Sequence, residues 1–171
     1  MCLSLKTLFN SMFKKKLEKK WEFNPNTIVN VNTNIKTDYS IEVVCKLILN
    51  KILNITDVNL LIVDNDKLVK RFDTTDIEIQ AFLQGYPILK KYVLYLRDGI
   101  SKGMLFHIIC HEMIHLKQYY DGKLRLDGTT FTWYGLKYNS KTPYWNRPWE
   151  IEARDKQYDI ADKVKRLYYE Q

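Results

Sequence analysis

The sequence predicts a single domain of the α+β class. Its 171 residues match the size of one ordinary domain. Some segments alternate apolar and polar residues, which is typical of half-buried strands, and others repeat apolar residues every three or four positions, which is typical of helices. Neither an internal repeat nor a long Gly/Ser/Pro-rich linker divides the chain. We therefore expect strands and helices to share one core, in the order α-β-α-β-β-β-α-β-β-α.

Residues 1–22 are expected to form a basic amphipathic helix or arm ahead of the main domain, residues 23–171. Apolar residues recur along this segment near helical spacing, and five lysines gather at residues 14–20. The sequence Asn24-Pro25-Asn26 then interrupts the helix. The segment either packs one face on the domain as a solvated helix or docks on a partner, on nucleic acid or on a membrane surface.

The main domain opens with two strands joined by a helix. Residues 29–35 alternate between apolar and polar types, which predicts a strand with one exposed face. Residues 41–53 carry an apolar stripe at helical spacing, and Asp38 or Ser40 can cap this helix. The apolar run at residues 58–63 predicts a buried strand.

A turn and two further strands follow. The polar residues 64–67 predict the turn. Apolar residues alternate from Ile77 to Leu83, which predicts a strand that ends at Gly85-Tyr86-Pro87. The segment Tyr92–Arg97 predicts the next strand, closed by Asp98-Gly99.

Two long helices with a β segment between them fill the second half. Ser101 can cap the first helix, and Gly122 suits the left-handed position that ends it. Pro148 is favourable at the start of the second helix. The predicted elements of this half are the helix Ser101–Tyr120, a hairpin or irregular β segment from Lys123–Leu126 and Thr130–Tyr134, the loop Asn139–Arg147 and a final helix Trp149–Tyr169.

The sequence His111-Glu112-Met113-Ile114-His115 lies within the first of these helices. Residues four positions apart share one helix face, so both imidazoles can bind one metal ion. Neutral imidazole nitrogen is a preferred ligand of Zn²⁺. Glu112 can then serve as general base towards a metal-bound water. The alternative is that both histidines are core residues satisfied by hydrogen bonds, because unpaired buried polar groups are unfavourable.

A catalytic zinc site needs a third protein ligand. His107 shares the histidine stripe but lies about 12 Å along the helix axis from His115, so we expect it to pack or to support the ligands from outside. Asp121 could ligate a metal in principle. However, the residues between His115 and Asp121 include no glycine, which would ease the turn that brings Asp121 back to the metal. Glu150, in the first turn of the final helix, is the stronger candidate.

Glu150 and Glu152 lie close together at the start of the final helix. An acidic residue is favoured there by the helix dipole, so Glu150 also has a simpler interpretation as the partner of Arg154 four residues on. Ala153 is small and would leave room beside a metal. Glu152 faces elsewhere, so the two carboxylates cannot share one role; Glu152 is an alternative ligand or an outer partner.

These motifs resemble those of the gluzincin group of zinc peptidases, in which His-Glu-x-x-His is followed by Glu-x-x-Ala on a second helix. More narrowly, HEMIHLKQ with the later YWNRPWEIEAR is similar to small metallopeptidase-like proteins of phages and bacteria. The resemblance covers about residues 100–160. It implies a zincin-like fold with a small mixed or antiparallel sheet, an active-site helix and a C-terminal helix that carries the third ligand. In this resemblance, the zinc ligands correspond to His111, His115 and Glu150. The catalytic base corresponds to Glu112, and a less constrained acidic position corresponds to Glu152.

The resemblance also implies zinc-dependent hydrolysis of peptide bonds. Zinc would polarise the scissile carbonyl and its bound water, Glu112 would carry the proton to the leaving group, and a Tyr, His or Arg would stabilise the oxyanion. Gluzincins have an edge strand, antiparallel to bound substrate, before the active-site helix, and Tyr92–Arg97 could supply it. The candidates for the oxyanion are Tyr134, Tyr138, Tyr144 and Arg147, each of which can also be a packing or surface residue.

Composition excludes several other classes of protein. A net charge of +7 excludes an acidic tail, and the apolar runs are too short to span a membrane. The N-terminus lacks the small-residue cleavage site of a secretory signal, and the three cysteines show no regular spacing. We therefore expect reduced thiols and a cytoplasmic location, which for a phage-encoded protein means the host cytoplasm or the virion.

Two other functions are compatible with the sequence. The chain could be a structural or assembly component, for example a phage virion protein, that retains a metallopeptidase fold without turnover. It could also be a basic nucleic-acid-associated module that uses the lysines of residues 14–20. The expected partners are a peptide or protein substrate, a large assembly bound through the N-terminal helix, and nucleic acid.

Overall fold

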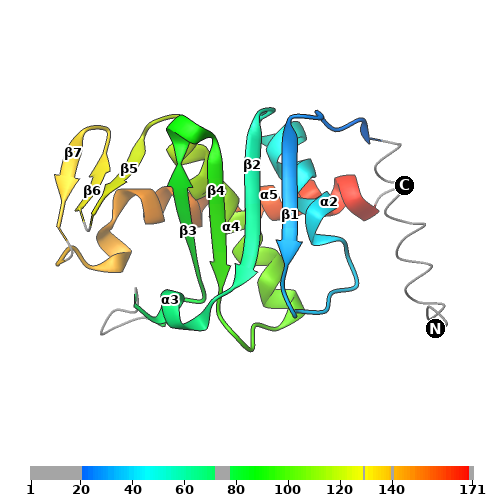
Figure 1. Cartoon of the computed structure of the whole chain (residues 1–171), viewed down its shortest axis with the longest axis horizontal. Coiled ribbons are helices and arrows are strands. Elements are labelled where there is room, and N and C mark those ends of the chain that lie inside the picture. The colour runs from blue at the N-terminus through cyan, green and yellow to red at the C-terminus, as the bar shows by residue number, and fades with distance from the viewer. Residues whose placement is uncertain (1–20, 72–77, 129, 140, 170–171) are drawn as a thin grey trace.

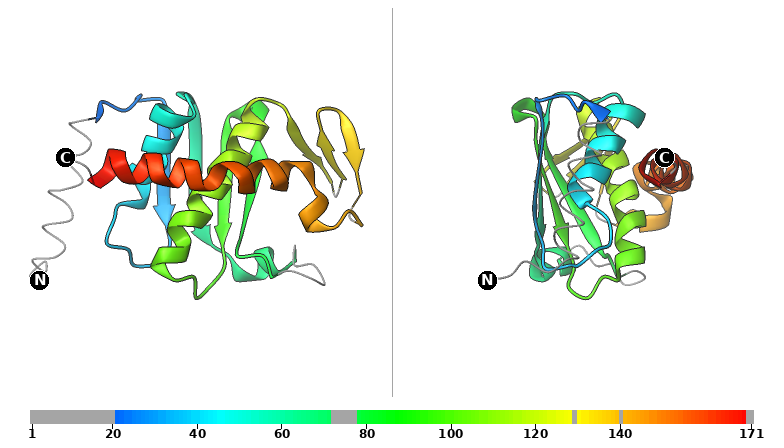
Figure 2. Two further views of the ribbon diagram at one scale, coloured as in Figure 1. Left: turned by 180° about the vertical axis from the view of Figure 1, so that it is seen from behind. Right: turned by 90° about the vertical axis from the view of Figure 1, so that its right-hand side faces the viewer.

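Figure 1 shows a computed structural model of the chain, which describes residues 21–71, 78–128, 130–139 and 141–169. The arm predicted at residues 1–22 falls almost wholly outside these ranges. Helices cover one face of a four-stranded mixed sheet, and a three-stranded antiparallel sheet lies beside it (Figures 1 and 2). The predicted α+β class is confirmed.

The main sheet has the strand order β1-β2-β4-β3. The strands β1 (Thr27–Asn32), β2 (Val58–Asp64) and β4 (Lys91–Leu96) run parallel. The fourth strand, β3 (Ala81–Tyr86), pairs antiparallel with β4. A short 3₁₀ turn, η2 (Pro87–Leu89), joins β3 to β4 as a hairpin. Antiparallel neighbours can be joined this way, whereas the parallel pair β1 and β2 needs a helical crossover.

The prediction that Tyr92–Arg97 supplies the edge strand is wrong. That segment forms β4, which lies between β2 and β3 and buries Tyr92, Leu94 and Leu96. The strand at this edge of the sheet is β3, which also packs against the histidine-bearing helix. The reason is the hairpin: β3 occupies one side of β4, and the parallel strand β2 occupies the other.

The crossover helix consists of α2 (Ile41–Lys46) and a π-helical continuation, η1 (Leu47–Ile52). Its predicted position is confirmed. Of the two capping candidates, Ser40 performs the role, because its hydroxyl accepts a hydrogen bond from the backbone N–H of Val43 at 3.3 Å. Asp38 instead pairs with Lys102.

The prediction of a turn at residues 64–67 is only partly correct, because a short helix, α3 (Asp66–Lys70), begins within this segment. The side chain of Asn65 accepts a hydrogen bond from the backbone N–H of Leu68 at 3.1 Å, which caps the first turn. Val69 is fully buried. A capping asparagine followed by a buried apolar residue therefore makes a helical turn where polarity alone suggested an open one.

Two long helices complete the main layer structure. The helix α4 (Lys102–Tyr120) lies on the sheet, and α5 (Pro148–Tyr169) crosses α4 on the side away from the sheet (Figure 2). Ser101 caps α4 as predicted, with its hydroxyl accepting from the backbone N–H of Met104 at 3.3 Å. Gly122 follows the end of α4 with φ of +71°, as predicted. None of the helices among the described residues combines the length and the hydrophobicity of a transmembrane segment.

A three-stranded antiparallel sheet connects the two helices. Its strands are β5 (Leu124–Asp127), β6 (Thr130–Trp133) and β7 (Leu136–Tyr138). The predicted hairpin of β5 and β6 is confirmed, but the sequence did not indicate β7. The two residues between β6 and β7, Tyr134 and Gly135, have φ of +49° and +81°. Two positive φ values suit a tight hairpin turn, and a tyrosine at the first position hides that signal.

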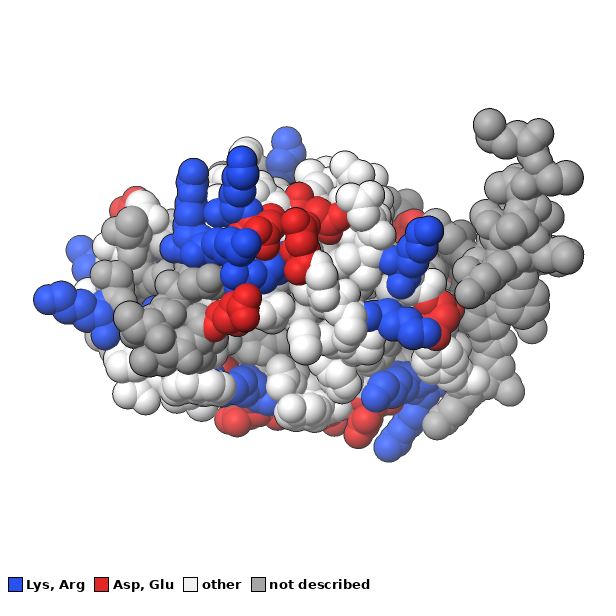
Figure 3. Space-filling view, turned by 90° about the horizontal axis from the view of Figure 1, so that it is seen from below, with Lys and Arg blue, Asp and Glu red and all other residues white. Residues whose placement is uncertain are grey.

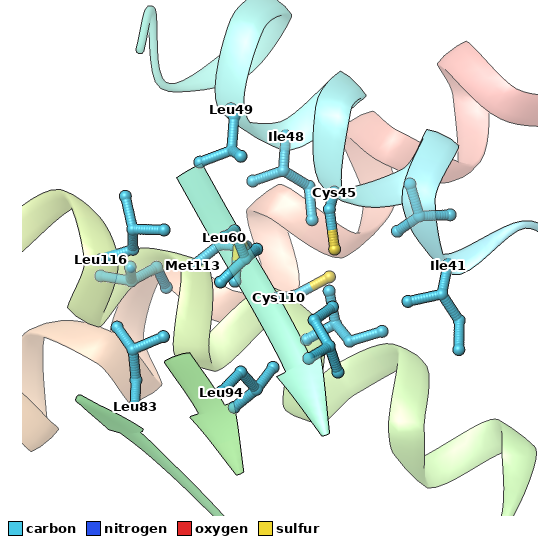
Figure 4. Packing of buried hydrophobic residues seen from close by; sticks show 14 of the residues in the cluster. Ile41, Cys45, Ile48, Leu49, Leu60, Leu83, Leu94, Cys110, Met113 and Leu116 are labelled. Atoms are coloured by element: carbon cyan, nitrogen blue, oxygen red, sulfur yellow. The ribbon is translucent and has the colours of Figure 1, made fainter. Parts of the chain in front are cut away.

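Apolar residues from the main sheet and the helices interlock in one core (Figure 4). Cys45 of α2 and Cys110 of α4 lie in it, fully buried, with their sulfur atoms pointing towards each other (Figure 4). Burial raises the pKa of the Cys110 thiol to about 12, and it raises that of Cys45 further. Both thiols therefore stay protonated and act as small apolar side chains.

Candidate metal centre

His111 and His115 lie on the face of α4 that is turned towards α5. The other side of α4 enters the core with fully buried residues such as Ile109 and Met113. The spacing of four residues brings the two imidazoles together, with 4.8 Å between ring centroids and 3.1 Å between the two Nε2 atoms. Two ring nitrogens are thus directed to one point, as the helical spacing predicts.

The first turn of α5 supplies a third group. Trp149 is buried, and its ring stacks on Phe131 of β6 with centroids 4.9 Å apart. This anchor holds the next residue, Glu150, against the histidines. The Oε2 atom of Glu150 lies 3.2 Å from Nε2 of His111 and 3.4 Å from Nε2 of His115.

Among the described residues, His111, His115 and Glu150 form the group that could hold a metal ion, with their ligand atoms within 4.8 Å of one another. Glu150 pairs with the two histidines and not with Arg154, so the simpler interpretation as an i,i+4 ion pair is wrong. Arg154 instead donates to the backbone carbonyl of Trp145 at 2.9 Å.

Burial and charge set the proton affinities in this cluster. Burial by itself would raise the pKa of Glu150, but His115 and His111 hold that pKa well below its usual range. Burial would lower the pKa of His115, yet the carboxylate of Glu150 outweighs it and raises this pKa to about 9. Without a metal, the positive charge of protonated His115 therefore balances the buried carboxylate of Glu150. A metal cation could replace that proton as the positive charge beside the carboxylate.

Two glutamine side chains hold the far nitrogen of each imidazole. The Oε1 atom of Gln157 lies 2.9 Å from Nδ1 of His111, and that of Gln118 lies 2.8 Å from Nδ1 of His115. A carboxamide oxygen can only accept a hydrogen bond, so each Nδ1 carries a proton, and in the neutral form of each imidazole the lone pair is on Nε2. This is the tautomer that a metal ligand requires.

Gln118 also ties α4 to α5. Its amide nitrogen donates to the backbone carbonyl of Trp149 at 3.0 Å and to Oε2 of Glu152 at 2.9 Å, and the residue is 1% exposed. Neither glutamine is among the site residues expected from the sequence. Spacing could have indicated them, because Gln118 lies one helical turn after His115 and Gln157 two turns after Glu150.

Glu112 is buried between α4 and β3. The backbone N–H of Leu83 donates a hydrogen bond to its carboxylate, whereas its Oε2 atom has no hydrogen-bond partner. Burial raises the pKa of Glu112, and the neighbouring His115 and His111 act in the opposite direction. A buried carboxylate with one oxygen unsatisfied, beside three converging ligand atoms, is well placed to accept a proton.

Glu152 and Asp121, the predicted alternative ligands, lie outside the cluster. Glu152 pairs with Lys156 at 2.5 Å and accepts from Gln118, so it reaches the histidines only through Gln118. Asp121 pairs with Lys117 at the end of α4. The structure therefore does not support either residue as a ligand. For Asp121 the reason is that α4 stays helical up to Tyr120, which leaves position 121 beyond the turn that carries the histidines.

His107 is not a ligand either. Its ring contacts Phe106 and Tyr158, each with centroids 5.9 Å apart, and its Nδ1 atom has no hydrogen-bond partner. The predicted distance of about 12 Å along the axis from His115 explains why it cannot join the other two. His107 lines the neighbouring part of the cleft instead.

The four candidates for oxyanion stabilisation divide into two pairs. Tyr144 and Arg147 line the hollow that contains the cluster, and the side chain of Tyr144 hydrogen-bonds with Glu150. Burial, with Glu150 next, raises the pKa of Tyr144, which therefore keeps its proton as a donor. Tyr138 packs against Trp149, and Tyr134 is 63% exposed, so the structure does not bring these two to the cluster.

A cleft with two compartments runs past the cluster. The two compartments diverge on either side of the residues that line both, which are Ile79, Ala81, His111, Glu112 and Tyr144. The first, which we call the aromatic compartment, extends under β5 and β6. The second, which we call the Arg154 compartment, extends along the N-terminal half of α4. The residues found only in the aromatic compartment are Phe82, Leu83, His115, Tyr119, Leu124, Phe131, Arg147, Trp149 and Glu150.

The chain matches no protein-family model, no curated protein and no solved structure.

Proposed function

We propose that the protein is a zinc-dependent peptidase with a gluzincin-like site. The observation that carries the proposal is the set of distances among three donor atoms: 3.1, 3.2 and 3.4 Å between the Nε2 atoms of His111 and His115 and Oε2 of Glu150. Tetrahedral coordination with bonds of about 2.0–2.1 Å separates neighbouring ligand atoms by about 3.3–3.4 Å. The cluster is therefore close to the spacing that one zinc ion requires.

The donor set supports zinc as the metal. Two neutral imidazoles and one carboxylate form a recognised combination for catalytic zinc, with the fourth position left for water or substrate. Bound zinc supplies a Lewis acid that polarises a carbonyl and acidifies a water molecule. Mg²⁺ and Ca²⁺ favour sites made of oxygen ligands, whereas two of the three groups in this cluster are imidazoles.

The protein's own residues supply the remaining chemistry. Glu112 accepts the proton of the attacking water at its unsatisfied Oε2 and delivers it to the departing amine. Arg147 offers donors to the developing oxyanion from the cleft wall, and Tyr144 can do so when its hydroxyl turns from Glu150 to the substrate. The edge strand β3 lies along the cleft through Ala81, where an extended peptide could add as a further strand.

Metal analysis and peptide hydrolysis test this proposal together. The wild-type protein should bind one equivalent of zinc and cleave members of a peptide library. Glu112→Gln should keep the zinc and lose about 10²–10⁴-fold in kcat, because it removes the general base. The matched control is Glu152→Gln, which changes a carboxylate on α5 outside the cluster and should leave hydrolysis within a few-fold.

Two outcomes would contradict the proposal. Full activity of Glu112→Gln would exclude the mechanism. Stoichiometric zinc without cleavage of any peptide by the wild type would favour the alternative of a structural or assembly component. On the face drawn in Figure 3, acidic side chains lie beside the basic side chains of the described residues. The lysines of residues 14–20, on which the nucleic-acid alternative rests, lie outside the described residues.

A further inference from the structure

We propose that Arg154 recognises a carboxylate of the substrate in the Arg154 compartment of the cleft. This inference rests on the proposed peptidase function and specifies its substrate class: peptides that present a carboxylate close to the scissile bond. The carboxylate is either the C-terminal group of the peptide or the side chain of Asp or Glu.

The first observation is an unsatisfied donor. The Nη1 atom of Arg154 is buried and has no hydrogen-bond partner, and the ion pairs of the described residues do not include Arg154. Leaving a buried guanidinium nitrogen without a hydrogen-bond partner costs free energy comparable to the loss of one hydrogen bond. Such an atom, placed in a cleft, indicates that a ligand completes its hydrogen bonding.

The second observation is that the guanidinium is held in place. Its Nη2 atom donates to the backbone carbonyl of Trp145 at 2.9 Å. The guanidinium lies over the ring of Trp145, 4.6 Å from the centroid, and 5.7 Å from the ring centroid of Tyr144. One edge is therefore fixed by a hydrogen bond and one face by an aromatic ring, which reduces the entropy lost when a carboxylate binds.

The third observation is its position relative to the cluster. Arg154 follows Glu150 by four residues on the same face of α5, a rise of about 6 Å along the helix. It lines the same compartment as His111 and Glu112. An extended peptide advances about 3.3–3.6 Å per residue, so a carboxylate at Arg154 lies within about two residues of the scissile bond.

The direction of β3 places this carboxylate on the C-terminal side of the cleavage point. Residues 78–81, which lead into β3, line the Arg154 compartment, and Ile79 and Ala81 among them reach both compartments. Phe82 and Leu83, further along β3, line the aromatic compartment alone. A peptide added antiparallel to β3 therefore has its C-terminal part in the Arg154 compartment. A short C-terminal segment would bring the terminal carboxylate to the guanidinium.

The charges of the compartment favour an anion. Of the two acidic residues in its wall, Glu112 lies at the end shared with the aromatic compartment, and Glu78 pairs with Arg97 at 3.1 Å and not with Arg154. Apolar side chains of Met104, Ile108 and Trp145 line part of this compartment, and a less polar surrounding strengthens a charge-assisted hydrogen bond.

The test uses N-acetylated hexapeptides, each prepared with a free C-terminal carboxylate and with a C-terminal amide. The wild-type protein should show about 10–100-fold higher kcat/KM for the free acids. Arg154→Met should remove this preference by lowering kcat/KM for the acids alone, and Arg154→Lys should keep part of it. Arg125→Met, which removes an exposed arginine from β5, is the matched control and should preserve the preference.

A second series separates the two sources of the carboxylate. Amidated peptides with Glu or Gln one or two residues after the scissile bond test the side-chain source. A Glu preference that Arg154→Met abolishes supports recognition of an acidic side chain, and a preference confined to the free acids supports the terminal carboxylate. Equal cleavage of acids, amides, Glu and Gln peptides by the wild type would overturn the proposal.

Binding to zinc-loaded Glu112→Gln provides a readout that does not depend on turnover. Calorimetry should show the same preference for acids, and adding Arg154→Met should abolish it without changing the zinc content. If no peptide is cleaved but this binding preference is present, the peptidase function fails and the carboxylate site stands. If peptides are cleaved without any preference for acids, the peptidase function stands and the carboxylate site fails. If Arg154→Met does not fold, an unchanged acid preference in Arg154→Lys and Arg154→Gln would overturn the proposal, and a reduced one would support it.

Discussion

Glu150 and Glu152 lie two residues apart on α5, yet the structure gives them opposite environments. Glu150 is buried, and its carboxylate lies within 3.4 Å of both histidine Nε2 atoms. Glu152 is partly exposed and pairs with Lys156 and Gln118. Two residues correspond to about 200° of rotation around a helix, which explains the divergence. Identical chemistry at neighbouring positions therefore serves a metal-binding cluster on one face and a supporting network on the other.

The largest expected effect comes from removing the inner carboxylate. Glu150→Ala should lower zinc affinity by more than the roughly 10–100-fold that loss of an outer partner costs, because a direct ligand is lost. Glu152→Ala should retain stoichiometric zinc. Inductively coupled plasma mass spectrometry after dialysis against a weak chelator measures both. Equal zinc loss in the two variants would show that the two faces of α5 are not distinct in function.

The pH dependence of the metal-free protein should sharpen the same contrast. The pKa of His115 is raised to about 9 by Glu150, against an unfolded value near 6.5, so the protonated histidine stabilises the fold fully below about pH 6.5. This stabilisation is lost as the pH rises through about 9, and its size is on the order of a few kcal/mol. Thermal unfolding in the presence of EDTA should show Tm falling across this range.

The matched variants decide whether Glu150 is the cause. Glu150→Gln should flatten the decline of Tm between pH 6.5 and 9, whereas Glu152→Gln should leave it in place. A decline that persists unchanged in Glu150→Gln would show that another group titrates.

A smaller effect is expected at the outer partner of His115. Gln118→Leu removes the acceptor of the Nδ1–H and should weaken zinc affinity about 10–100-fold. Gln118→Glu keeps an acceptor and should retain more of the affinity, although it loses the donor to Glu152. Competition with a fluorescent chelator measures this, with thermal unfolding as the control for folding. Unchanged affinity in Gln118→Leu would show that Gln118 only joins the helices.

Part of this site could be predicted because it depends on local periodicity. The positions of α4 and of its two histidines follow from a spacing of four residues, and the capping role of Ser101 follows from its position before the helix. The preference for Glu150 over Glu152 came from the motif resemblance, and the packing of Trp149 on Phe131 is what directs Glu150 towards the histidines. No sequence rule links residues 131 and 149.

Other features required long-range contacts. The sequence placed two consecutive strands at about residues 77–83 and 92–97 but could not decide which one forms the edge, because strand order depends on which partners pair across the sheet. The roles of Gln118 and Gln157 depend on the contact between α4 and α5.

The α+β class, the helices α2, α4 and α5 and the residue types of a metal-binding cluster could be predicted from the sequence, since helical spacing and residue chemistry are local properties. The edge position of β3 beside the cleft, the place of Arg154 in the cleft wall and the lack of a hydrogen-bond partner at its Nη1 atom follow from the folded structure alone. These features arise where α5 crosses α4 and where β3 folds back on β4. Such packing depends on how distant apolar surfaces fit together, which a local pattern does not specify.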